Sequence, residues 1–98
     1  MTMQLKVDLS TLYERAITSY TRCIRDEENK YLQDEVSVPL EYVIPFEKDV
    51  RFIFSGKSPT EYIIEISLSL LVDNELVGNY LYTVNSDLDG IDDALTFY

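Results

Sequence analysis

The strongest constraint on the fold is an alternation of apolar and polar residues between residues 62 and 84. From residue 62 to residue 72 every even position holds a large apolar side chain, whereas Glu and Ser occupy most odd positions. A β-strand produces a period of two residues and a helix does not. Asp73-Asn74-Glu75 interrupts the alternation with residues typical of turns. The predicted core-facing positions are Tyr62, Ile64, Ile66, Leu68, Leu70, Val72, Leu76, Tyr80, Tyr82 and Val84, with Gly78 among them.

This segment therefore predicts an antiparallel hairpin. Its odd-numbered face also carries apolar residues, namely Ile63, Leu71, Val77 and Leu81. Scattered apolar residues are normal on a protein surface. The alternative is that this second face contacts another chain, because a small domain of mixed helix and sheet has nothing else to cover it. On that alternative, Ile63 and Leu81 are candidate contact residues.

The segments before the hairpin predict one long helix and further strands. Thr11-Leu12-Tyr13-Glu14 fits a capping box, and the apolar stripe that follows predicts a helix to about Leu32. Residues 3–7 are compatible with a short edge strand. Residues 36–46 and 50–54 alternate again, with Glu47-Lys48-Asp49 expected as a turn. Their even-numbered apolar residues, which include Ile44 and Phe46, are expected to face the helix. Two prolines in the first of these segments predict either an edge strand or a strand that is broken near a proline.

After Val84, residues 85–98 predict either a short helix capped near Asp89 or a last strand. The expected fold is therefore α+β, with one long N-terminal helix packed on a roughly four-stranded antiparallel sheet. At 98 residues, the chain is expected to form a single domain spanning residues 1–98.

The charge of the chain is unevenly distributed. The net charge is −10, and every Lys and Arg lies at or before Lys57. Residues 58–98 carry carboxylates and no basic residue; these are Glu61, Glu65, Asp73, Glu75, Asp87, Asp89, Asp92 and Asp93. A negative field of this kind attracts a basic partner and speeds its docking. It argues against direct binding to nucleic acid or to an anionic membrane surface.

Composition also limits compartment and chemistry. No apolar run approaches the length of a membrane span, the N-terminal residues lack a signal-peptide pattern, and the single Cys23 excludes an internal disulfide. These features favour the cytoplasm. The chain has no His, which removes the commonest general base and the usual zinc ligands. We therefore expect no catalysis and no cofactor.

Two short motifs resemble ligand-binding loops. Gly56-Lys57-Ser58 follows a strand, but Arg51 stands where a phosphate-binding loop needs its first Gly. Asn85-x-Asp87-x-Asp89-Gly90 matches the first half of a calcium loop, but Thr96 replaces its bidentate Glu. We interpret both as turns.

The leading functional hypothesis is a small acidic binding protein that neutralises a basic partner, such as a nuclease, a restriction or CRISPR component, or another protein that handles nucleic acid. In length, acidity and tyrosine content the chain is similar to bacterial immunity proteins and phage-encoded inhibitors. This similarity is one of composition alone. The partner would be blocked by occlusion, as carboxylates meet the Arg and Lys that contact phosphate. The candidate partner-binding residues are the eight carboxylates of residues 58–98 together with Ile63 and Leu81.

The alternative hypothesis is a self-associating structural or accessory subunit. A homodimer would then form through the odd sheet face or through an open strand edge.

Overall fold

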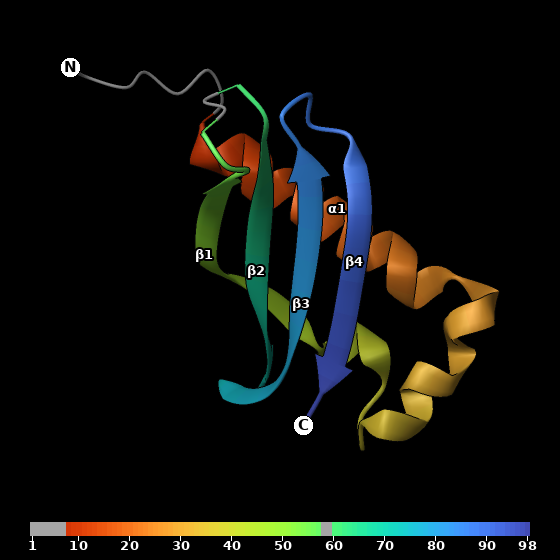
Figure 1. Cartoon of the computed structure of the whole chain (residues 1–98). Coiled ribbons are helices and arrows are strands. Elements are labelled where there is room, and N and C mark those ends of the chain that lie inside the picture. Colours follow the sequence, from red (N-terminus) through yellow and green to blue (C-terminus); the bar gives the residue numbers. More distant parts are fainter. Residues whose placement is uncertain (1–7, 58–59) are drawn as a thin grey trace.

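The computed structural model describes residues 8–57 and 60–98. Its elements in chain order are α1 (Leu9–Arg25), the 3-10 helices η1 (Glu27–Glu35) and η2 (Leu40–Tyr42), and the strands β1 (Ile44–Phe54), β2 (Tyr62–Val72), β3 (Glu75–Asn85) and β4 (Gly90–Phe97). The strands pair antiparallel in the order β1-β2-β3-β4. Figure 1 shows α1 crossing one face of this sheet, with η1 continuing beyond β4. The predicted α+β fold class is confirmed.

The core lies between α1 and the even-numbered side of the central strands. Leu12, Ala16 and Tyr20 follow one another at intervals of four and form a single buried stripe on α1. They belong to the same buried cluster as the core residues of the sheet: Val43, Ile64, Ile66, Leu68, Leu70, Tyr80 and Val84. The alternation of β2 thus determines which face of the sheet meets the helix.

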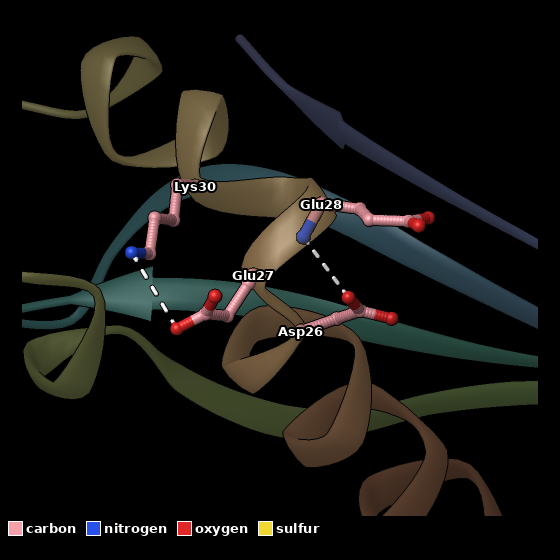
Figure 2. A network of polar contacts seen from close by, with 4 residues as sticks. All are labelled: Asp26, Glu27, Glu28 and Lys30. Atoms are coloured by element: carbon pink, nitrogen blue, oxygen red, sulfur yellow. Dashed lines mark hydrogen bonds and ion pairs between the residues drawn. The ribbon is translucent and has the colours of Figure 1, made fainter.

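The ends of α1 differ from the sequence prediction. Asp8, not Thr11, caps the helix, and its carboxylate accepts a hydrogen bond from the Thr11 amide at 2.8 Å. The helix ends at Arg25 instead of about Leu32, because Asp26 has extended backbone angles and its carboxylate accepts from the Glu28 amide at 3.0 Å (Figure 2). Acidic side chains are unfavourable at a helix C-terminus and favourable at an N-terminus, so the acidic run Asp26-Glu27-Glu28 begins a new helix.

The predicted turn at residues 47–49 is wrong. This segment lies within β1, where Glu47 pairs with Leu68 and Asp49 pairs with Ser67, so that Lys48 forms a bulge. Residues 36–42, predicted as strand, contain bends and η2 instead. The edge position predicted from the two prolines is confirmed, since β1 is an outer strand of the sheet.

The bulge in β1 reverses the expected orientation of two large side chains. One extra residue shifts the alternation, so residues on the two sides of Lys48 use opposite parity to face α1. Ile44 and Phe46 therefore pair with Leu71 and Ser69 and lie on the face away from α1. They are 59% and 60% exposed.

A second bulge occurs in β3. Leu70 pairs with Gly78, whereas Leu71 pairs with Leu76, so Val77 is the additional residue. Leu76, expected in the core, is 54% exposed, and Val77, expected on the odd face, packs against the core. A Cβ on Gly78 would overlap the backbone oxygen of Thr96, so Gly78 permits β4 to approach closely.

The C-terminal segment forms β4, which confirms the strand alternative for this part of the chain. The turn before it is closed by Asn85, whose side-chain oxygen accepts from the amides of Asp87 and Asp89 at 3.0 Å each. The edge strand predicted for residues 3–7 lies outside the described residues. In the part of the chain that the structure describes, no helix is long and apolar enough to cross a membrane.

Candidate functional site

The face of the sheet opposite α1, here called the open face, is not covered by any helix of the described chain (Figure 1). Cross-strand pairing places Ile44, Leu71 and Leu76 in one row near the β2–β3 turn. Ile53 and Ile63 form a second apolar pair at the other end of the sheet. The open face therefore has apolar residues at both ends.

The two predicted apolar contact residues both lie on this face. Ile63 pairs with Ile53 and Asn85, and Leu81 pairs with Ser67 and Ala94. Both side chains are half-buried. Ser67 stands four residues along β2 from Ile63, so Ile63 and Leu81 occupy separate places on one surface rather than a single contact point.

The row at the β2–β3 end borders a hollow of about 540 Å³. Its lining includes the apolar side chains of Tyr42, Ile44, Phe46 and Leu71, with Asp73 and Asn74 at the turn. This patch was not predicted, because the alternation assigned the even positions of residues 36–46 to the core. A bulge at Lys48 leaves no clear mark in the pattern, so the change of face was not predictable from alternation alone.

The predicted carboxylates do not form one cluster. Asp73 and Glu75 lie at the β2–β3 turn. Glu61, Asp87 and Asp89 lie at the opposite end of the sheet, where the start of β2 pairs with the end of β3. All five are exposed and surround the open face at its two ends.

Glu65 is not an uncompensated charge. Its carboxylate forms a salt bridge at 3.2 Å with Arg51, which pairs opposite it on β1. The alternation places Arg51 and Glu65 on the open face. There this pair lies between the apolar residues at one end of the sheet and those at the other. Glu65 is consequently the least available of the predicted partner-binding carboxylates.

Asp92 and Asp93 point to opposite faces of β4. Asp92 pairs with Thr83 on the open face, and Asp93 pairs with Tyr82 on the helix side. The Asp93 carboxylate accepts from the Tyr80 hydroxyl at 2.9 Å, and that hydroxyl lies 2.6 Å from the Ser19 oxygen on α1. Asp93 therefore has a structural role in joining β4 to β3 and to the helix, which sequence reasoning did not detect.

A polar groove lies beside Asp93, between α1, η1 and β4. It has a volume of about 400 Å³ and is lined by Ser19, Arg22, Cys23, Asp26, Asn29, Tyr31, Leu32, Asp93 and Leu95. Burial raises the pKa of the Cys23 thiol, and the carboxylates of Asp93 and Asp26 raise it further. A raised pKa favours the protonated thiol, which is a poor nucleophile. Most of the side chains that line the groove are polar or charged.

The two loop motifs behave as turns. Gly56 has a positive φ of 56° in the turn after β1, and Ser58 lies outside the described residues. The side-chain oxygen of Asn85, the first position of the calcium-like motif, is already engaged by two backbone amides. Among the described residues no group of three or more His, Cys, Asp or Glu side chains is arranged to hold a metal ion.

Comparison of the chain with protein-family models, with curated proteins and with solved structures found no match.

Proposed function

We propose that this protein is an acidic binding module that occludes a basic surface of another protein. The observation that carries the proposal is the separation of charge within the fold. The segment from β2 to β4 contains no Lys or Arg, whereas α1, η1 and β1 contain most of the basic residues. A partner that approaches the sheet from its open side therefore meets carboxylates and apolar side chains, together with Arg51, which is paired with Glu65.

The geometry supports binding in two ways. The exposed carboxylates at both ends of the open face supply long-range attraction, which raises the rate of encounter with a cationic partner. The apolar rows between them supply area that association removes from water, and this burial stabilises the complex. A nuclease or another nucleic-acid-handling protein has a cationic groove of the required sign, so that class of partner fits best.

The test begins with capture of the partner from host extract and its purification. Binding of the purified partner is then measured over a series of salt concentrations. We expect association to slow steeply as salt rises, because exposed charges are screened beyond ~8 Å at physiological ionic strength. An association rate that does not change with salt would contradict the proposal.

A second candidate function is self-association through the open face. It is favoured by the exposed apolar side chains of Ile44, Phe46 and Leu76 on the open face, since contiguous exposed apolar residues mark interaction sites. The net charge of −10 on each copy opposes it. Sedimentation at high micromolar concentration separates the two functions: a dimer that Leu81→Lys or Phe46→Lys dissociates supports self-association, and a monomer excludes it.

A further inference from the structure

We propose that β4 is the docking edge for the partner, and that an extended basic segment of the partner adds to β4 as a fifth strand of the sheet. This inference rests on the proposed function and names the part of the partner that is recognised. It concerns the edge of the sheet and the groove beside it, not the open face.

The two edges of the sheet differ in their ability to accept a strand. β1 and β4 are the outer strands. β1 contains Pro45, which has no amide donor, and a bulge at Lys48, and both features are known to protect an edge from pairing. β4 has no proline, and its register shift lies at its start, where Val84 pairs with Gly90 and Ile91 is the additional residue. From Thr83↔Asp92 to Gly78↔Phe97 its pairing with β3 is regular. β4 is therefore the better template for an added strand.

The direction of the backbone groups can be deduced from the observed bonds. The amide of Tyr98 donates to the Val77 oxygen at 2.8 Å, so residue 98 faces β3. Antiparallel pairing alternates, so the amides of Thr96 and Ala94 also face β3, whereas those of Leu95 and Phe97 face outward. The Asp93 amide is bound by the Asp92 carboxylate at 2.9 Å, which agrees with an outward direction. Leu95 and Phe97 thus present donors and acceptors to an added strand.

The surroundings of this edge favour basic side chains. Asp26 and Asp93 line the groove on the helix side of β4, with Arg22 as the cation among them. Asp92 lies on the other face of the strand. Figure 2 shows the side chains of Asp26 and Glu28 directed to one side of the start of η1, and the Glu27–Lys30 pair directed to the other. Alternating side chains of an added strand would meet a carboxylate on either face, which matches lysine or arginine.

The same charges disfavour a second copy of this chain as the occupant. Pairing β4 with its own copy would bring Asp92 and Asp93 of both chains onto two adjacent strands. β4 contains no basic residue to offset them. Like charges on neighbouring strands are destabilising, so the edge selects a strand of opposite charge.

The experiment uses a synthetic peptide as long as β4 that repeats two lysines followed by two valines, so that lysine lies on both faces of the added strand. A peptide with glutamate in place of each lysine is its control. Amide exchange and chemical shifts of the full chain are followed by NMR during titration. We expect the lysine peptide to protect the amides of Leu95 and Phe97, and the glutamate peptide to have no effect.

Two substitutions at one position isolate the backbone bond. Leu95→Pro removes an outward amide without removing a bond to β3, and Leu95→Ala truncates the same side chain but keeps the amide. Leu95→Pro should weaken the lysine peptide about tenfold or more, whereas Leu95→Ala should change its affinity little. If Leu95→Pro does not fold, the protection measured on the native chain decides.

The outcomes separate this inference from the proposed function. Peptide binding that perturbs Ile63 and Leu81 and is unaffected by Leu95→Pro overturns docking at β4 and leaves the binding function standing. A dimer that Leu95→Pro dissociates overturns docking of a basic strand at β4 and assigns the edge to a second copy. Absence of lysine-peptide binding also overturns docking of a basic strand at β4. The proposed function itself fails only when the captured partner shows no dependence on salt.

Discussion

The rings of Tyr20 and Tyr80 meet edge to face, with their centroids 5.5 Å apart and their planes at 70°. Their hydroxyls are in different situations. The Tyr80 hydroxyl lies 2.6 Å from Ser19 and donates to Asp93. The Tyr20 hydroxyl is buried and has no hydrogen-bond partner among the described residues. Two neighbouring tyrosines in one core therefore differ in whether their polar atom is satisfied.

This difference predicts opposite effects of the same substitution. Tyr80→Phe should reduce the free energy of unfolding by about 1–2 kcal/mol, because it removes two hydrogen bonds and leaves Ser19 and Asp93 without this partner. Tyr20→Phe should be neutral or stabilising, because it removes a buried hydroxyl that lacks a partner. Urea unfolding of both variants is the measurement. An equal loss in the two variants would show that the Ser19–Tyr80–Asp93 chain contributes nothing specific.

The buried tyrosines also predict loss of stability at alkaline pH. Burial raises the pKa of Tyr20 to about 12, and burial likewise raises that of Tyr80. In the unfolded chain a tyrosine ionises near 10, so above that pH the unfolded state loses a proton that the folded state keeps. The contribution of these two tyrosines to the free energy of unfolding should therefore be constant below about pH 10 and should fall between about pH 10 and 12.

The measurement is unfolding followed by circular dichroism at several alkaline pH values. Tyr20→Phe should make the decline shallower, because the unfolded chain then has one fewer of these protons to lose. Tyr31→Phe, at an exposed position, is the matched control and should leave the slope unchanged. A decline equally steep in native and Tyr20→Phe protein would assign the effect to other groups.

Gly78 lies where β4 approaches β3 closely, so a larger residue at this position should weaken the pairing of these two strands. A Cβ at this position would overlap the backbone oxygen of Thr96, and a backbone atom cannot rotate away as a side chain can. Gly78→Ala should destabilise the protein by about 1–3 kcal/mol, as overpacking typically does, and should loosen β4 in particular. Amide exchange should accelerate at Ala94 and Thr96 more than at Ile64 and Ile66 of β2. Uniform acceleration would mean that β4 does not open by itself.

The start of α1 gives a test of which residue caps it. The Asp8 carboxylate accepts from the Thr11 amide, and this backbone hydrogen bond lowers the pKa of Asp8. Asp8→Ala should lower the melting temperature at neutral pH, whereas Glu14→Ala, which removes the expected capping-box partner, should have little effect. Because the folded pKa is lowered, the contribution of Asp8 is present above its unfolded pKa and is lost as the pH falls through the folded value. A larger effect of Glu14→Ala than of Asp8→Ala would contradict capping by Asp8 and would support the predicted capping box.

Alternation in β2 was sufficient to predict the core, because Ile64, Ile66, Leu68 and Leu70 belong to a strand without an internal bulge. The prediction failed for Ile44, Phe46 and Leu76, since one extra residue at Lys48 or Val77 reverses the faces and leaves no mark in composition. These errors concealed the apolar row on the open face.

The candidate site was predicted less well than the fold. Charge counting identified the acidic segment but not its division between two ends and two faces of the sheet, because position in space depends on strand register. The contact of Asp93 with Tyr80 and Ser19, and the groove beside Cys23, join residues far apart in sequence. Only the folded arrangement brings them together.

The last prediction concerns which carboxylates drive association with the captured partner. Asp87 and Asp89 lie in an exposed turn, and the hydrogen bonds that they make with Asn85 use their backbone atoms, so charge reversal there should leave the fold intact. We expect Asp87→Lys with Asp89→Lys to slow association and to flatten its dependence on salt, because these charges act at long range.

Two other variants serve as controls for this pair. Glu27→Lys should have a smaller effect, because Lys30 already lies 3.6 Å from the Glu27 carboxylate and both side chains are well exposed. Asp93→Asn keeps the side chain's shape and an acceptor for Tyr80, so a change in the dissociation rate there would report contact at β4. Reversal at Asp93 is avoided, since loss of the Tyr80 contact would disturb the fold. If the turn pair and Glu27→Lys slowed association equally, the effect would be one of net charge and not of a specific surface. No loss from the turn pair would show that association does not depend on these two carboxylates, and would leave the apolar open face around Ile63 and Leu81 as the contact.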